Sequence, residues 1–181
     1  NCDPERLATE AGFRADPPLV WRWYAERREG IARAEPNPGH HAIARLGRRA
    51  PGLHVVTQNV DGLHQRAGST DVTELHGSIL RARCLAGCGE AGPEWQQDIR
   101  VPPPCARCGA PLRPDVVWFG EMLPEAALRR AQAAAIACDL MIVVGTSAQV
   151  YPAAELPFLA ARGGAAVIGV NPEPTPLDRI A

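Results

Sequence analysis

Four cysteines are spaced closely enough to bind one metal ion. They form a C-x3-C pair and a C-x2-C pair separated by sixteen residues, and they are Cys84, Cys88, Cys105 and Cys108. Four thiolates in two short loops surround Zn²⁺ tetrahedrally and leave no open position for catalysis. A pair of disulfides is the alternative, but no secretory signal peptide is recognisable, and glycines beside the cysteines suit tight zinc-binding turns. We therefore predict a structural zinc ion.

The composition of the chain argues against several classes of protein. Its 181 residues are 46% hydrophobic, which is sufficient for one core with a small satellite module. A net charge of -1 provides no bulk attraction to nucleic acid or to anionic membranes. No apolar run approaches the ~20 residues needed to span a bilayer. We expect a cytoplasmic protein whose partners are neither nucleic acid nor membranes.

Hydrophobic periodicity alternates between helices and strands along the chain. Asp16 can cap a helix that begins at Pro17 and includes Ile31, and further helices are expected at 39–49, 124–138 and 152–162. Short apolar runs at 53–57, 139–144 and 165–170 are predicted to be buried parallel strands. This alternation indicates an α/β fold, a Rossmann-like parallel sheet with helices on both faces. The expected domains are a helical segment at 1–50, a Rossmann-like domain at 51–79 and 114–181, and a zinc-binding module at 80–113.

Polar segments leave the carboxyl ends of all three predicted strands. They are Thr57 to His64, Gly145 to Ser147, and Asn171 to Glu173. In a parallel sheet, ligands collect at this edge, where short hydroxyl and amide side chains beside glycine can approach phosphate and ribose closely. Each segment alone is an ordinary turn signal. Their convergence in one sheet favours a nucleotide site.

Five motifs, in order, resemble the sirtuin family of NAD-dependent protein lysine deacylases. They are TQNVDGLH at 57–64, ELHGS at 74–78, the four cysteines, VVWFGE at 116–121 and VVGTS at 143–147. The match extends over nearly the whole chain. The resemblance implies NAD as cofactor, a structural zinc ion, and acylated protein lysines as substrates.

The resemblance also implies a mechanism. In sirtuins the acyl-lysine carbonyl oxygen attacks C1′ of the nicotinamide ribose and expels nicotinamide, and a histidine then accepts a proton from a ribose hydroxyl. The products are nicotinamide, free lysine and 2′-O-acyl-ADP-ribose. His76 would be that base, because imidazole can take up a proton near neutral pH, and Asn59 would share the catalytic site. For an isolated His-Gly pair, a solvated turn histidine is the alternative.

By the same resemblance, the cofactor-binding residues lie in the three polar segments. Gln58 and Asn59 would line the ribose pocket, and Asp61 would accept a hydrogen bond from the nicotinamide carboxamide. Thr146, Ser147 and Asn171 would hold the adenosine side. The full expected set is Gln58, Asn59, Val60, Asp61, Gly145, Thr146, Ser147, Asn171, Pro172 and Glu173.

A segment after the cysteines would bind the substrate peptide. Its residues are Val117, Trp118, Phe119, Gly120 and Glu121. The resemblance implies that they pair with the peptide backbone as an added strand, which supplies affinity with little side-chain selectivity. Trp118 and Phe119 would form a wall of the acyl-lysine tunnel, with burial in the core as the alternative.

Tyr24 and Arg27 bear on which acyl group is removed. At i and i+3 they share one face of the predicted helix. Tyr-x-x-Arg resembles the motif by which one sirtuin subgroup recognises succinyl, malonyl and glutaryl lysine. A guanidinium offers two parallel donors to a carboxylate, and a phenol adds a third. A solvated arginine-rich helix face is the alternative.

The sequence also departs from the sirtuin pattern. The family begins with a strand and a Gly-Ala-Gly-x-Ser loop that leads to a Pro-x-Phe-Arg step, and Phe13-Arg14 is not that step. The family's last strand and helix are also missing, so we expect part of the NAD site to be absent from these 181 residues. Two other classes stay open: a non-catalytic fragment that binds zinc or nucleotide, and an ADP-ribosyl transferase on the same scaffold. Against nucleic-acid binding, Arg100 and Arg107 are the only basic residues between the zinc ligands.

Overall fold

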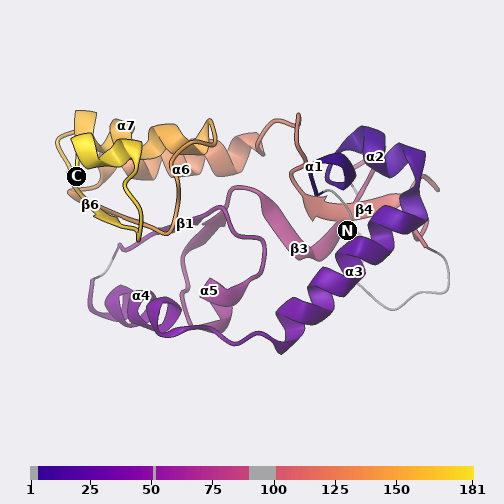
Figure 1. Cartoon of the computed structure of the whole chain (residues 1–181), viewed down its shortest axis with the longest axis horizontal. Helices are drawn as coiled ribbons and strands as arrows, with labels where there is room; N and C mark the ends of the chain where they lie inside the picture. Colours follow the sequence, from indigo (N-terminus) through magenta and orange to yellow (C-terminus); the bar gives the residue numbers. More distant parts are fainter. Residues whose placement is uncertain (1–3, 51, 90–100) are drawn as a thin grey trace.

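The computed structural model describes residues 4–50, 52–89 and 101–181 (Figure 1). Part of the predicted zinc module, including Arg100, therefore lies outside the described residues. Every helix among the described residues is too short or too polar to cross a membrane. The predicted domain boundaries stay a prediction.

The first part of the chain is helical, and three of its four helices begin at side-chain caps. They are α1 (Pro4–Leu7), α2 (Glu10–Ala15), α3 (Pro17–Arg33) and α4 (Pro38–Arg49). Asp16 caps α3 as predicted, because its carboxylate accepts the Leu19 backbone N–H at 2.9 Å. At α4, Asn37 and His40 form a reciprocal capping box. Local chemistry thus determines where both long helices start.

The strands pair two by two. β1 (Val55–Thr57) is parallel to β2 (Val72–Glu74), β3 (Gly77–Cys84) is antiparallel to β4 (Leu112–Val116), and β5 (Leu140–Val144) is parallel to β6 (Ala166–Val170). The predicted strands are β1, β5 and β6, each slightly shorter than expected. β2, β3 and β4 were not predicted. The remaining elements are α5 (Leu63–Arg66), α6 (Glu125–Ala137), η1 (Ala153–Glu155), α7 (Leu156–Arg162) and η2 (Pro176–Arg179).

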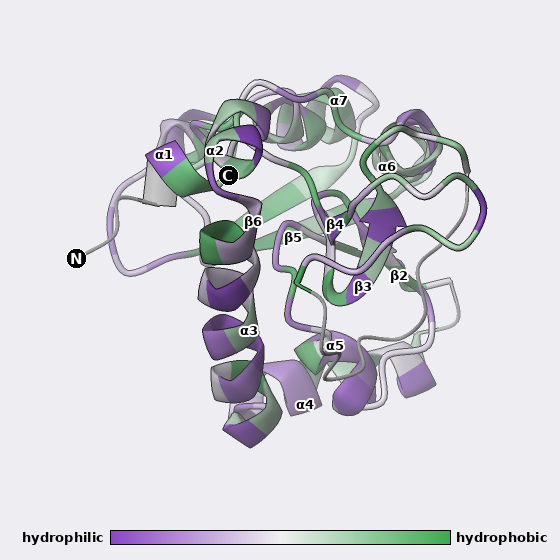
Figure 2. Ribbon diagram, turned by 90° about the vertical axis from the view of Figure 1, so that its right-hand side faces the viewer, coloured by the Kyte–Doolittle hydropathy of each residue, from purple (hydrophilic) through white to green (hydrophobic). Residues whose placement is uncertain are grey.

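Helices cover one face of the β5–β6 pair. In Figure 1, α6 and α7 run side by side, and their small residues Ala131, Ala135 and Ala160 are buried with Leu156. On the other face, Leu140, Ile142, Val144, Ile168 and Val170 are between 43% and 53% exposed. The ribbon of β5 and β6 is correspondingly green in Figure 2. Among the described residues, no element covers this face of β5 and β6.

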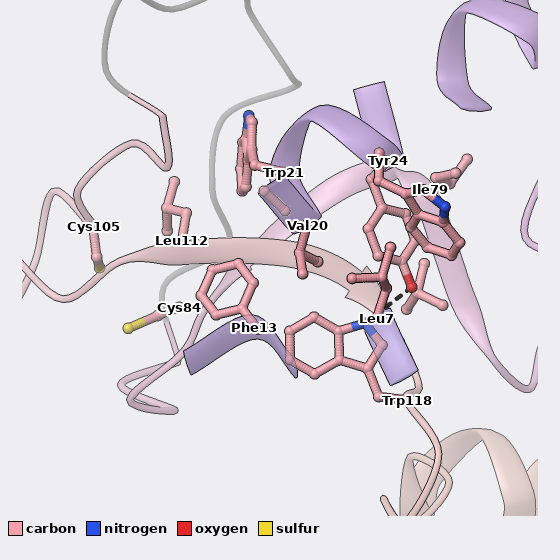
Figure 3. Packing of buried hydrophobic residues seen from close by; sticks show 13 residues of the cluster. Leu7, Phe13, Val20, Trp21, Tyr24, Ile79, Cys84, Cys105, Leu112 and Trp118 are labelled. Carbon is pink, nitrogen blue, oxygen red and sulfur yellow. Dashed lines mark hydrogen bonds between the residues drawn. The ribbon is translucent and has the colours of Figure 1, made fainter. Parts of the chain in front are cut away.

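A second hydrophobic core joins the first helices to the β3–β4 pair. Trp118 is buried in it and packs on Phe13, with ring centroids 5.3 Å apart. Figure 3 shows Tyr24 and Ile79 on the other side of this tryptophan. The same cluster includes two predicted zinc ligands, Cys84 and Cys105. The cysteine module is thus packed directly against this core.

Candidate functional site

His76 lies in the short connection between the two hydrophobic cores. Leu75, one residue before it, is buried against α6, and Ile79, three residues after it, is buried in the Trp118 cluster. His76 Nδ1 lies 3.0 Å from the carbonyl oxygen of Gln58. Because a carbonyl can only accept, Nδ1 carries the proton of the neutral imidazole and Nε2 carries the lone pair. Nε2 is therefore the atom able to take up a proton.

Gly77 permits the two strands to meet beside His76. Its φ of +76° is in the left-handed region, and a Cβ at this position would lie 2.1 Å from the carbonyl oxygen of Asp115. Only glycine can have this backbone at such a close approach. The Val117 backbone N–H then donates to the carbonyl oxygen of His76 at 2.9 Å. This hydrogen bond joins the histidine segment directly to the predicted peptide-binding segment.

The polar loop after β1 is ordered by its own side chains. Thr57 Oγ1 accepts the Asn59 backbone N–H at 3.1 Å, and Asp61 Oδ1 accepts the Leu63 backbone N–H at 2.9 Å. The carbonyl oxygen of Val60 accepts the Ile79 N–H at 2.9 Å. The loop is thereby held against β3, next to His76.

The loop after β1 also meets the segment after β5. Gln58 Nε2 donates to Thr146 Oγ1 at 3.4 Å, although the two residues are 88 positions apart. Two of the three predicted polar segments therefore converge, with Gln58 contacting both His76 and Thr146. Asn59 and Ser147 have exposed side chains in the same two segments.

The third segment borders a cavity beyond the ends of β5 and β6. This cavity has a volume of about 420 Å³ and is lined by Thr146, Asn171, Pro172 and Glu173, among others. Gly145 donates its N–H to the Val170 carbonyl at 3.0 Å, which brings the two strand ends together. Thr175 and Asp178, at the start of η2, also line the cavity. They were missed in the sequence, where the Thr-x-x-Asp capping box of η2 was the available signal.

The predicted peptide-binding segment uses most of its backbone donors internally. The N–H groups of Val117, Trp118 and Phe119 donate to the His76 carbonyl, the Glu121 carboxylate and the Ala8 carbonyl, respectively. Trp118 is 2% exposed and is a core residue, whereas Phe119 is 62% exposed. The two aromatic neighbours therefore have opposite environments.

Tyr24 and Arg27 lie on one side of α3, in contact with aromatic rings. The Tyr24 hydroxyl accepts the Trp118 indole N–H at 3.0 Å, as the dashed line in Figure 3 marks. Burial raises the pKa of Tyr24, an effect that the indole hydrogen bond and the charges of Arg113 and Arg27 oppose only in part. The phenol thus keeps its proton at neutral pH and can donate it. Arg27 is exposed, and its guanidinium lies 3.3 Å from the centroid of the Trp23 ring.

The four cysteines form a group with the geometry of a zinc site. Their sulfurs lie within 4.8 Å of one another, including Cys84 to Cys108 at 3.4 Å and Cys88 to Cys105 at 3.5 Å. A disulfide requires about 2.05 Å, whereas a tetrahedron with Zn–S bonds of 2.3 Å has edges of about 3.8 Å. Each pair starts a tight turn, in which Gly87 and Gly109 donate to the carbonyls of Cys84 and Cys105. The donor set fits zinc, and the disulfide alternative does not fit the distances.

Known proteins place the chain in a family. Residues 1–152 match the Sir2 family. The NAD-dependent protein deacylase of Ralstonia nicotianae is 56% identical over 179 residues, which are 99% of this chain and 72% of the relative. The chain belongs to the Sir2 family. Another relative of this Sir2 chain, the NAD-dependent protein deacylase of Aquifex aeolicus, is 52% identical over 98% of the chain and 74% of its own length.

Solved Sir2 structures have the same fold as this Sir2 chain. The crystal structure of a Sir2 homologue in complex with NAD has a TM-score of 0.91 and 47% identity, covering 98% of this chain and 70% of that one. A Sir2 protein bound to an acetylated peptide has a TM-score of 0.88 and 37% identity, covering 97% and 75%. The predicted sirtuin resemblance and Rossmann-like α/β fold are confirmed.

Proposed function

We propose that this chain catalyses the NAD-dependent removal of acyl groups from protein lysines. One observation carries the proposal: Gln58 joins His76, whose Nε2 is the available base, to Thr146 at the end of β5. The residues that would accept a proton and those that would bind a dinucleotide are therefore neighbours. The Sir2 structures with NAD and with an acetylated peptide support the same assignment.

The residues around the site have distinct parts in this reaction. When bound, NAD would supply a ribose C1′ able to receive the acyl-lysine oxygen, with nicotinamide as the leaving group. His76 Nε2 accepts the proton of a ribose hydroxyl, and the Gln58 carbonyl keeps the imidazole in the required tautomer. Asn59 would line the ribose pocket, and Asp61 would accept a hydrogen bond from the nicotinamide carboxamide.

The adenosine side of the dinucleotide occupies the cavity beyond β5 and β6. Thr146 and Asn171 line it with hydroxyl and amide groups, which suit ribose and adenine. Thr175 and Asp178 belong to the same lining and join the residues assigned to this side. Ser147 and Gly145 shape the loop that enters the cavity.

We further propose that succinyl or malonyl lysine is preferred to acetyl lysine. The Tyr24 hydroxyl already accepts from Trp118, so its own proton is available for a carboxylate. Arg27 is close enough to influence the charge state of Tyr24, and a guanidinium can bind the same carboxylate through two donors. The proposed partners are acylated proteins in the cytoplasm, not nucleic acid or membranes.

Release of nicotinamide in the presence of NAD and an acylated peptide tests the main assignment. His76→Ala should lower the rate by about 10²- to 10⁴-fold, the usual contribution of a general base. His41→Ala is the matched control, because His41 is exposed on α4, and it should leave the rate unchanged. Equal rates for wild type and His76→Ala would refute the role of His76. Nicotinamide release with labelling of protein, and without loss of the acyl group, would indicate ADP-ribosyl transfer instead.

Comparison of succinyl and acetyl peptides tests the acyl preference. Arg27→Met should lower kcat/KM for the succinyl peptide by roughly 10- to 100-fold and spare the acetyl peptide, because only the former loses a charged hydrogen-bond partner. Arg22→Met, an exposed change on the same helix, is the control. If Arg27→Met lowers both activities equally, or neither, then Arg27 is not an acyl-recognition residue.

A further inference from the structure

Arg113 is a buried cation that contacts the predicted peptide-binding segment from its buried side. It lies on β4, is 3% exposed, and its guanidinium carbon is 3.2 Å from the centroid of the Trp118 ring. Its Nη2 donates to the Val116 carbonyl at 2.8 Å and to Glu121 Oε2 at 3.0 Å, and its Nη1 donates to Glu121 Oε1. A single side chain therefore contacts the start, the middle and the end of the segment from Val116 to Glu121.

Glu121 receives these bonds with its side chain turned inward. Its carboxylate also accepts the Trp118 backbone N–H at 2.9 Å and a bond from Arg83 at 3.0 Å, while its own N–H donates to the Trp118 carbonyl. The carboxylate thus closes the turn from Trp118 to Glu121. The side chain of Glu121 is therefore engaged within the protein, and the expected pairing of this segment's backbone with the peptide stays a prediction.

The outward side of the same segment is open. Phe119 is 62% exposed and Met122 is 87% exposed, whereas Trp118, which stacks on Arg113, is buried. The segment therefore has an inner half, fixed by Arg113 and Glu121, and an outer half available to a ligand. Apart from the contacts of Arg113 and Glu121, the described backbone bonds that hold this segment to the rest of the protein are those from Val117 to His76 and from Phe119 to Ala8.

Further ion pairs extend from the Arg113–Glu121 pair toward His76. Arg83 and Arg81 both contact Asp115, at 3.9 and 3.1 Å, and Arg81 also contacts Glu74 at 2.8 Å. Glu74 is two residues before His76. Arg81 and Arg83 are substantially exposed, so their pairs are weaker than the buried one at Arg113. Of these three arginines, Arg113 is therefore the one on which the shape of the segment from Val116 to Glu121 most depends.

We propose that Arg113 is a positioning residue for the acyl-peptide substrate, acting through Trp118 and Glu121. By stacking on the indole and binding both carboxylate oxygens, it holds the segment in the shape that pairs with the peptide backbone. Arginine suits this role because its planar guanidinium can stack and donate in two parallel directions at once, which lysine cannot do. The inference rests on the proposed deacylase function, in which this segment binds the substrate.

Binding and kinetics of Arg113→Met, Arg113→Lys and Glu121→Gln test this role. We expect the Kd of a fluorescently labelled acyl peptide, and the peptide KM, to rise by roughly 10- to 100-fold in Arg113→Met, because the Glu121 carboxylate loses its buried partner. The KM for NAD should change by less than the peptide KM. Glu121→Gln should have the same selective effect, and Arg113→Lys should recover part of the affinity. Arg129→Met, which removes an exposed ion pair on α6, is the matched control.

The outcomes separate this inference from the proposed function. If the wild-type protein neither binds the acyl peptide nor releases nicotinamide with it, the deacylase proposal fails. If the wild-type protein does both, and the variants leave peptide Kd and KM unchanged or shift the peptide and NAD constants equally, Arg113 has no positioning role. Should Arg113→Met not fold, as judged by circular dichroism, Arg113→Lys and Glu121→Gln decide the question by the same criterion.

Discussion

Substitution of Gly77 by alanine tests the geometry that places His76. The added Cβ would lie 2.1 Å from the Asp115 carbonyl oxygen, whereas an ordinary carbon–oxygen contact is about 3.3 Å. β3 and β4 would therefore have to separate by about 1.2 Å at this point. The hydrogen bond from Val117 to the His76 carbonyl spans the same gap and would be stretched or lost.

The expected magnitude has two parts. An alanine in the left-handed region costs about 1 to 2 kcal/mol, and loss of the neighbouring hydrogen bond adds about 1 kcal/mol. We expect Gly77→Ala to lower the free energy of unfolding by about 2 to 3 kcal/mol. A displacement of about 1 Å at a catalytic group can reduce the rate by about 10²-fold, so kcat/KM should fall by a similar factor.

Gly164→Ala is the matched control for backbone strain. Gly164 also has a positive φ, +95°, but nothing lies within 4 Å of a Cβ built there. It should lose only the strain energy, about 1 to 2 kcal/mol, and keep its activity. Thermal or urea unfolding measures the stability, and nicotinamide release measures the activity. Equal losses for the two variants, with activity retained in both, would refute the argument that close strand approach at Gly77 positions His76.

Two further predictions concern the metal and pH. Metal analysis should find one zinc ion per chain, and less than about half an equivalent of zinc would contradict the one-site prediction. Removal of zinc by a chelator, or Cys105→Ser, should lower the melting temperature and disorder the nearby Trp118 core, because Cys105 packs in that cluster. For Glu121, burial alone would raise the pKa, but hydrogen bonds from Arg113 and the Trp118 backbone, with the charges of Arg113 and Arg83, lower it below the ordinary value. Its ionised form therefore stabilises the fold fully above pH ~4.3, the unfolded value, and this stabilisation is lost as pH falls through the lower folded pKa. The difference in melting temperature between wild type and Glu121→Gln should be constant near neutral pH and shrink below pH ~4; a constant difference down to pH ~2 would contradict the lowered pKa.

The sequence by itself determined features that depend on short spacings. The four cysteines were recognisable as one metal site because both knuckles are local, and the structure brings their sulfurs within 4.8 Å. Asp16 begins α3 as predicted, since a cap is a contact between residues three positions apart. The polar segments after β1, β5 and β6 were identified from strand ends alone. Their assigned roles in binding NAD stay predictions.

Tertiary structure decided which of the remaining side chains face inward. Trp118 and Phe119 are adjacent and both aromatic, yet one is buried against Tyr24, 94 positions away, and the other is exposed. Arg113 was not recognisable as a buried cation paired with Glu121, because charged residues are usually solvated and only the packing of β4 against Trp118 buries the guanidinium. No local pattern encodes such contacts, since they depend on which distant segments fold together.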